Sequence, residues 1–316
     1  MADAGEPAGA VRDERLRLVL LCAHPALAPE AAAALTLRLV LGLSTADIAR
    51  LFLVRVPTMA ARLTRARKRL AGERFEVPSG EALHERLRVA ADVAYLAFTA
   101  GYAPPSGDEV LRADLAGEAV RLVRTLRELA PPSVELDALL ALVLLQHARR
   151  DARVADGELV LLPDQDRSRW HDDEVDEALG LLRPHVDAPA GPYLLQALVA
   201  AEHAVAPTAA DTDWSRIADR YRELEALTGS PVVRLNRAVA VAEADGPLAG
   251  LALLDGPGGL AEGALPGHRL PGVRAELLRR AGRYAEARDA YAAALTACDN
   301  APERRHLARR LHTLGI

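Results

Sequence analysis

Four residues between positions 58 and 69 recur at the spacing of one helix stripe and carry side chains suited to nucleic acid. They are Thr58, Arg62, Arg65 and Arg69, at i, i+4, i+7 and i+11. A guanidinium fork pairs with phosphate and with the O6/N7 edge of guanine, and a helix fits the DNA major groove. The pattern predicts DNA contacts by Arg62 and Arg65. A solvated amphipathic helix has the same pattern and is the alternative.

Candidates for contacts with the phosphate backbone are Arg55, Arg69 and Thr58. Arg55 and Arg69 are expected to meet phosphate, so their loss should weaken binding to all sequences. Thr58 has two interpretations, a phosphate contact or an N-terminal helix cap.

The segment 44–70 supplies the elements that would position these side chains. Ser44 can cap a short helix together with Asp47, and Leu53 and Val54 fill a tight turn. A second helix then begins near Pro57, a residue suited to a first turn. Its apolar residues recur every three or four positions and predict one buried stripe: Met59, Leu63, Ala66 and Leu70. The segment therefore predicts a helix-turn-helix.

Charge is distributed unevenly along the chain. The 316 residues carry a net charge of −5. Residues 11–76 hold 12 Lys plus Arg against 6 Asp plus Glu, a net of +6, which leaves −11 for the remainder. A basic module on an acidic chain favours a localised nucleic-acid footprint over nonspecific coating of DNA.

A second group of charged residues lies in a polar stretch and raises the question of catalysis. It comprises Asp164, Asp166, Arg167, Arg169 and Trp170. Acid-base chemistry needs paired groups with separated pKa values, and the sequence offers no nucleophile, metal cluster or phosphate loop beside them. We therefore expect no enzyme, no catalytic residue and no cofactor. The interpretation is a structural or signal-sensing loop, pinned by Asp-Arg pairs and anchored by Trp170.

The sequence gives no pattern for a metal or for a membrane. Cys22 and Cys298 are far apart, and the Cys22–His24 spacing is interpreted as a buried thiol and a loop histidine. We expect no metal. Residues 1–10 lack the regions of a signal peptide, and no apolar run reaches membrane-spanning length. These features predict a cytoplasmic protein whose first ten residues are disordered.

The remaining chain predicts an all-α fold. Between the predicted helices, residues 152–170 are the least helical, with 158–162 as either a short strand or part of a loop. Small and aromatic residues near the end follow the spacing of a tetratricopeptide repeat: Gly282, Tyr284, Ala287, Tyr291 and Ala294. The expected helices beyond position 80 are 81–99, 113–129, 136–150, 172–182, 192–203, 214–228, 232–244 and 247–254.

Several strings resemble a known family. The stretch 13–70 resembles region 4 of extracytoplasmic-function (ECF) sigma factors, with TMAARLTRARKRL as the recognition helix. The strings YLAF, DQDRSRW, DTDW and LNRAVAVAE follow in the order found in members with a tetratricopeptide-like C-terminal extension. DTDW can also be a simple aspartate cap on the helix of Trp214.

The resemblance implies three parts and a role in transcription initiation. These parts are a disordered terminus (1–10), a region 4 domain (11–76) and an all-helical tetratricopeptide-like extension (77–316). Region 4 would read the −35 element of promoter DNA and dock on the β flap of RNA polymerase. The extension would regulate this activity or receive a regulatory partner protein. The alternative is a repeat-based protein-protein interaction module with secondary DNA binding.

The sequence departs from the family at three places. The family begins with a region 2 domain, whereas this sequence starts at the linker before region 4, which predicts a fragment or a natural truncation. Arg55, Val56 and Pro57 stand where the family tends to have Pro-Glu-Ala, which adds a cation beside the groove. Ala23 replaces a cysteine usual in the family.

Overall fold

The computed structural model describes residues 14–73, 80–130, 132–261 and 263–314. Within these ranges the protein is 71% helical, with fifteen α-helices and one two-stranded sheet, so the all-α prediction is confirmed. The expected disorder of residues 1–10 lies outside the described residues.

The helices follow one another with short connections. Most predicted ranges match, and the bounds of three helices, 113–129, 172–182 and 214–228, are the predicted ones. In chain order they are α1 (Glu14–Cys22), α2 (Pro29–Leu39), α3 (Thr45–Leu51), α4 (Val56–Leu70), α5 (Gly80–Tyr102), α6 (Ala113–Leu129), α7 (Val134–His147), α8 (Asp172–Leu182), α9 (Pro192–Val205), α10 (Trp214–Thr228), α11 (Pro231–Asp245), α12 (Pro247–Asp255), α13 (Arg269–Arg280), α14 (Tyr284–Ala297) and α15 (Ala301–His312).

Helices α3 and α4 form the predicted helix-turn-helix. The Ser44 hydroxyl accepts a hydrogen bond from the Asp47 backbone N–H at 3.0 Å, which caps α3. Leu53 turns the chain with a φ of 54°, in the left-handed region. Helix α4 then begins with Pro57 in its first turn. Its four buried residues are the predicted ones: Met59, Leu63, Ala66 and Leu70.

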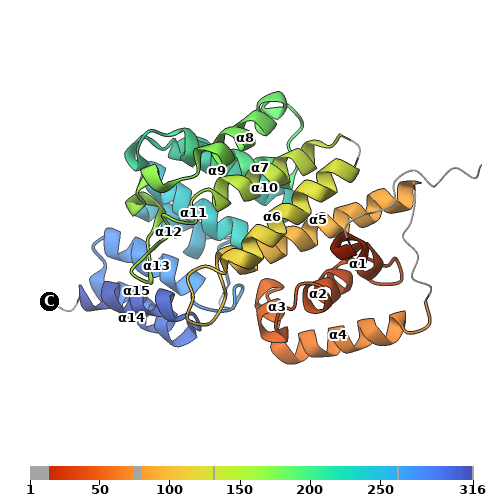
Figure 1. The fold of residues 1–316 in the computed structure, drawn as a ribbon. Helices are drawn as coiled ribbons and strands as arrows, with labels where there is room; N and C mark the ends of the chain where they lie inside the picture. Colours follow the sequence, from red (N-terminus) through yellow and green to blue (C-terminus); the bar gives the residue numbers. More distant parts are fainter. Residues whose placement is uncertain (1–13, 74–79, 131, 262, 315–316) are drawn as a thin grey trace, which may run out of the picture.

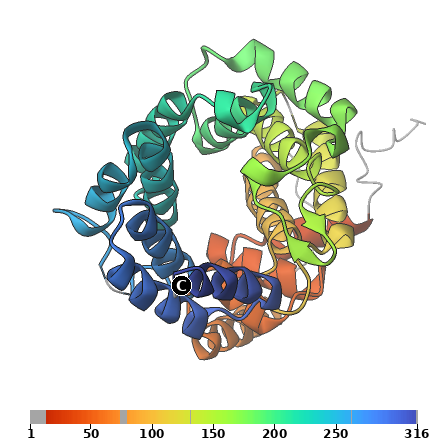
Figure 2. The same cartoon turned by 90° about the vertical axis from the view of Figure 1, so that its left-hand side faces the viewer.

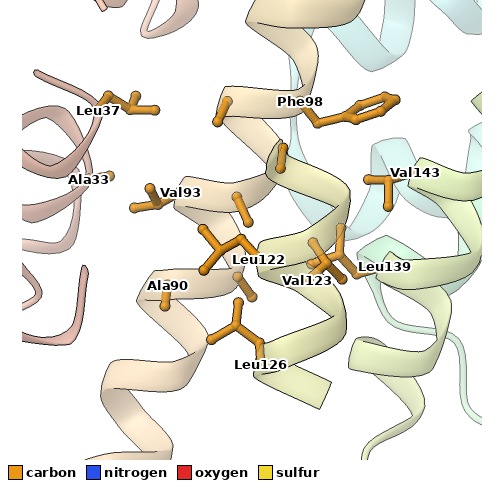
Figure 3. Packing of buried hydrophobic residues seen from close by; sticks show 14 of the residues in the cluster. Ala33, Leu37, Ala90, Val93, Phe98, Leu122, Val123, Leu126, Leu139 and Val143 are labelled. Carbon is orange, nitrogen blue, oxygen red and sulfur yellow. The ribbon is translucent and has the colours of Figure 1, made fainter. Parts of the chain in front are cut away.

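One hydrophobic core joins the helix-turn-helix bundle to the helices that follow. In Figure 3, Val93 on α5 points toward Leu37 on α2, while Leu122 and Leu126 on α6 lie on the other side of α5. All four belong to a single buried cluster that runs from α1 to α9. The packing is close, because a Cβ on Gly101 would lie 2.6 Å from the Ala116 backbone nitrogen. The division at residue 76 stays a prediction, and the core is continuous across it.

The helices after α10 pack in antiparallel pairs. Helix α11 pairs with α12, and α13 with α14. Gly282 makes the turn of the second pair with a φ of 76°, a conformation that favours glycine. On α14, Ala287 and Tyr291 are buried as the repeat spacing predicts, but Tyr284 is 54% exposed.

The chain follows a closed ring. Figures 1 and 2 show the C-terminal helices, in blue, beside the red and orange helices of the helix-turn-helix bundle. Sequence spacing gives no sign of this closure, since it joins residues about as far apart as the described chain allows.

The segment between α7 and α8 contains both a short strand and an ordered loop, which were the two predicted alternatives for residues 158–162. Strand β2 (Glu158–Leu159) pairs with β1 (Val154–Ala155) in a small antiparallel hairpin. Two single turns of 3₁₀ helix follow, η1 (Leu162–Asp164) and η2 (Arg167–Arg169). The strand is thus shorter than 158–162, and the rest is an ordered loop.

Candidate nucleic-acid interface

The outward face of α4 carries the predicted DNA-contacting residues. Thr58 and Arg65 are exposed, and Arg62 is half-buried. The Arg62 guanidinium lies 5.9 Å from the centroid of the Phe52 ring on the preceding turn, which restricts its direction. The Arg65 Nε donates to the carbonyl of Ala61 at 3.3 Å, so its stem follows the helix. Both side chains come from the side of the helix adjacent to the buried stripe.

The two expected phosphate contacts differ from each other. Arg55 is exposed and is the N-cap residue of α4, without a side-chain cap bond. The Arg69 Nε donates to the carbonyl of Ala26 at 2.7 Å, so this exposed side chain also ties α4 to the loop between α1 and α2. Thr58 lies three residues inside the helix start, so its interpretation as an N-terminal cap is wrong.

Two further cations on α4 were not singled out from the sequence. Arg67 and Lys68 are exposed in the last turn, where the helix dipole favours positive charge. Among the residues that the structure describes, no cation of α4 forms an ion pair with a carboxylate. The run ARKRL would have revealed both. The face of α4 is therefore a strongly basic surface whose cations form no ion pair with a carboxylate of the described chain.

The other helix of the motif contacts the C-terminal part of the chain. The Arg50 guanidinium of α3 lies 2.5 Å from the Asp299 carboxylate, in the turn between α14 and α15. On the same helix, the Asp47 carboxylate accepts a hydrogen bond from the Ser106 hydroxyl at 3.0 Å and lies 3.8 Å from the Arg112 guanidinium. The loop between α5 and α6 therefore lies against α3.

The same loop is fastened to the turn before α15. Asn300 is buried, and its side-chain amide donates to the carbonyls of Pro104 and Glu109 at 3.2 and 3.0 Å. Backbone bonds add to this, since Gly107 donates to the Asp299 carbonyl at 3.2 Å and accepts from the backbone N–H of residue 301 at 2.8 Å. The turn before α15, the α5–α6 loop and helix α3 form one connected interface.

The predicted regulatory loop is ordered, but by other contacts than expected. Trp170 is 8% exposed, which confirms it as an apolar anchor. The predicted Asp-Arg pairs are wrong within the described residues. Asp166 instead accepts from the backbone and hydroxyl of Ser168, and Arg167 donates to the His203 carbonyl at 2.9 Å. Asp164 and Arg169 are exposed. In this loop Asp166 therefore accepts hydrogen bonds from a residue two positions away and does not pair with an arginine of the described chain.

The DTDW string has the simple interpretation. The Asp213 carboxylate accepts from the backbone N–H of Arg216 at 2.9 Å and caps α10. Asp211 forms a capping box with Thr208 at the turn η4 (Ala209–Asp211). Both aspartates are therefore used in helix starts.

One trio within the described residues has metal-ligating side chains close together. The ligand atoms of His268, Cys298 and Glu303 lie within 4.8 Å of one another. His268 Nε2 lies 2.6 Å from a Glu303 oxygen, so an ion pair accounts for this proximity. Burial opposes the charged form of Glu303, but the hydrogen bond with His268, helped by the positive charges of Arg269 and Arg153, lowers the pKa of Glu303 below its ordinary value. These two cations disfavour a divalent metal here.

Cys22 and His24, interpreted from the sequence as a thiol and a loop histidine, lie at the end of α1 and in the loop that follows. Burial raises the pKa of the half-buried Cys22 thiol. His24 Nδ1 accepts from the backbone of Ala26 at 3.2 Å, as a loop histidine would.

Two family models match separate parts of the chain. Residues 17–70 match the family described as "Sigma-70, region 4". Residues 86–185 match a family of unknown function (DUF6596). The chain is also 43% identical over 314 residues to the uncharacterized protein R00370 of Rhizobium meliloti (strain 1021), which covers 96% of this chain and 72% of that protein. No solved structure matches.

The chain contains a sigma-70 region 4 segment and belongs to one family with protein R00370. The matched region 4 begins in α1 and ends with α4, so it contains the complete helix-turn-helix. Region 4 is a non-enzymatic, DNA-binding part of transcription initiation proteins, which act with RNA polymerase. Of the helices that the structure describes, none is long and apolar enough to span a membrane.

Proposed function

We propose that this protein acts in bacterial transcription initiation as the C-terminal part of an ECF sigma factor. Its region 4 would bind the −35 element and dock on the β flap of RNA polymerase, and its extension would regulate that binding. The observation that carries the proposal is the separation on α4 between a buried apolar stripe and a basic face whose cations pair with no carboxylate of the described residues. A solvated structural helix needs no such excess of unpaired cations.

Within this proposal the α4 residues have different tasks. Arg62 and Arg65 would contact base edges in the major groove, because they project from the middle turns of the recognition helix. Arg55 and Thr58 would contact phosphate, and Arg69 would do so while also holding the α1–α2 loop. The stacking of Arg62 on Phe52 favours its role, since a side chain restrained before binding loses less entropy on binding.

The contact between α3 and the C-terminal turn supports regulation by the extension. The first helix of a DNA-bound helix-turn-helix crosses the phosphate backbone. Arg50 on α3 would be suited to such a phosphate, but it is paired with Asp299. A carboxylate at this surface also repels phosphate. We therefore propose that the turn before α15 lowers the affinity of α3 for DNA, and that moving this turn away raises it.

The remaining parts fit the same proposal. Residues 11–76 would be the DNA-binding module and residues 77–316 the extension, although they share one core. The antiparallel pairs from α11 to α14 resemble tetratricopeptide units and offer a surface for a regulatory partner protein. Because promoter DNA and RNA polymerase are cytoplasmic, we place the protein in the cytoplasm.

The proposal is tested by selecting duplexes from a random DNA pool with the purified full chain. We expect enrichment of a short common sequence, and binding that weakens steeply with salt. A pull-down with core RNA polymerase and with the isolated β flap tests the second contact. If neither an enriched sequence nor retention on the flap is found, the interaction-module alternative replaces this proposal.

A further inference from the structure

Three arginines and two aromatic side chains from three segments pack into one cluster. We call Tyr102, Arg149, Arg153, Arg167 and Trp170 the arginine-aromatic cluster. The Arg153 guanidinium carbon lies 4.3 Å from the centroid of the Tyr102 ring. Arg149 lies 5.9 Å from Tyr102 and 5.8 Å from Trp170, and Arg167 lies 4.5 Å from Trp170. The cations therefore alternate with the rings and lie close to one another.

The positive charge of this cluster is balanced only at longer range, by Asp211 acting on Arg167 and by Glu303 acting on Arg153. Within the described residues, none of the three arginines forms an ion pair, and the one side-chain hydrogen bond among them runs from Arg167 to the His203 carbonyl. The neighbouring Arg150 shows the usual arrangement, since it lies 2.9 Å from Glu174. Aromatic faces attract cations but do not neutralise them. The cluster therefore holds three guanidinium charges in a partly buried place, with no described carboxylate in ion-pair contact with them.

The surroundings respond to this charge. Burial, together with the positive charges of Arg149 and Arg167, lowers the pKa of His203 to about 4. Burial and the charge of Arg149 also lower the pKa of Arg167. At neutral pH His203 is then uncharged, so the cluster keeps its three guanidinium charges and gains no fourth.

The same cluster contains most of the unsatisfied buried polar atoms of the described chain. Six buried side-chain polar atoms have no hydrogen-bond partner, and four belong to the cluster: Tyr102 Oη, Arg149 Nε, Arg153 Nε and Trp170 Nε1. Tyr102 and Trp170 are each only 8% exposed. All four groups can donate, and buried donors are normally satisfied. Unpaired donors, together with cations that no described carboxylate contacts in an ion pair, indicate an anionic acceptor.

A second arginine-lined place provides the contrast. A cavity of about 530 Å³ between α10 and α11 is lined by Arg222, Arg234 and Arg237. There the Glu225 carboxylate pairs with Arg234 at 2.5 Å and with Arg237 at 2.9 Å. This cavity already contains a carboxylate in ion-pair contact with its arginines, whereas no described carboxylate makes such a contact in the arginine-aromatic cluster.

We propose that the arginine-aromatic cluster binds a small oxyanion of the phosphate class, either inorganic phosphate or a phosphomonoester. A phosphate group offers several acceptor oxygens and about two negative charges, which match three guanidinium groups and the neighbouring O–H and N–H donors. The three arginines are partly exposed, so the site can be reached from solvent. This binding does not depend on the proposed role in transcription.

The position of the cluster gives such a ligand a route to the helix-turn-helix. Tyr102 ends α5, and the next residues form the loop that contacts α3 and Asn300. Arg153 acts electrostatically on Glu303 of α15. A phosphate bound between Tyr102 and Arg153 would act on the α5–α6 loop, which follows Tyr102, and on α15, which contains Glu303. The loop and the turn before α15 both lie at the interface with α3. This coupling, unlike the binding, rests on the proposed function.

The binding is tested by isothermal titration calorimetry of the full chain in chloride buffer without DNA. The probes are inorganic phosphate, glucose 6-phosphate and, as a carboxylate, citrate. We expect saturable 1:1 binding of phosphate or glucose 6-phosphate, accompanied by a change in tryptophan fluorescence from Trp170. Absence of binding by both phosphates, or binding of citrate alone, would overturn the assignment.

Variants locate the site. Arg153→Gln and Arg167→Gln should each weaken phosphate binding about tenfold or more, because each removes one charged partner. Arg169→Gln is the matched control, since Arg169 lies on the same turn but is exposed and outside the cluster. Equal affinity in all four proteins would contradict the site. Circular dichroism checks folding, and the wild-type titration remains decisive if a variant fails to fold. A DNA titration with and without phosphate tests the coupling separately.

Discussion

Across the part of the chain that the structure describes, the arginines of α4 and those of the arginine-aromatic cluster form no ion pair with a carboxylate, but the two groups differ in their surroundings. On α4 the cations lie on one exposed helix, where water hydrates them and the missing counter-charge costs little. In the cluster, three segments bring partly buried cations together around two aromatic rings. An exposed basic face suits a polyanion such as DNA, with strong salt dependence. A partly buried cluster with unpaired donors suits a small, specific anion.

Phe98→Ala tests whether the arginines of α4 and those of the arginine-aromatic cluster belong to one folding unit. Phe98 on α5 is fully buried in the core that runs from α1 to α9. Its loss should cost about 3–5 kcal/mol of unfolding free energy. In urea, tryptophan fluorescence reports the extension through Trp170 and Trp214, and DNA binding reports α4. Both signals should move together to lower urea.

Val186→Ala is the control for this substitution, because Val186 is 49% exposed. Its effect should remain within about 0.5 kcal/mol. If the two signals of the Phe98 variant separated, region 4 and the extension would unfold independently. The shared core would then not couple their stabilities.

A pH titration of the free energy of unfolding tests the surroundings of His203, which lies beside the arginine-aromatic cluster. The ordinary pKa of His203, 6.5, falls to about 4 in the folded protein. Between these values the unfolded state binds the proton and the folded state does not, so stability is complete above pH 6.5 and declines as the pH falls toward 4. The contribution is on the order of 1 kcal/mol per pH unit.

His203→Gln should make this decline shallower. His306, whose pKa is also lowered by burial, contributes in the same direction in both proteins. The measurement is therefore the difference between the two stability curves from pH 7 to pH 4. Parallel curves would show that neither burial nor the charges of Arg149 and Arg167 lower the pKa of His203 in the folded protein.

The smallest expected effect concerns the link between α3 and the extension. Asp299→Ala should raise DNA affinity by less than about fivefold, because an exposed ion pair contributes only about 0.2–1 kcal/mol. Asp219→Ala, in the exposed Asp219–Arg222 pair of α10, changes the net charge equally and is the control. If both variants gained equally, the gain would reflect net charge and not the release of Arg50.

Local patterns predicted the fold well. The buried stripe of α4 follows from the spacing of Met59 and Leu63, and the Ser44 cap follows from Asp47 three residues later. The start of α10 follows from its Asp213 cap. In each case the determining residues are within a few positions of one another, where helix geometry fixes their relation.

Long-range contacts were beyond the reach of the sequence. The Arg50–Asp299 pair joins residues 249 positions apart. The arginine-aromatic cluster needs the packing of α5 against α7 before Tyr102 can meet Arg149 and Arg153. The predicted Asp-Arg pairs of the loop were wrong because Asp166 found Ser168, two residues away, as a nearer partner. Helix α15 was not predicted, although Asn300 caps it.

The central claim is that α4 reads DNA through Arg62 and Arg65. The direct measurement is the affinity of the selected duplex and of a scrambled duplex for wild type, for the double variant Arg62→Ala/Arg65→Ala and for Arg288→Ala, at one salt concentration. Arg288 is an exposed arginine on α14 and serves as the control. The account predicts that the double variant loses about tenfold or more on the selected duplex and much less on the scrambled one. Equal affinities of wild type and double variant for the selected duplex would contradict it.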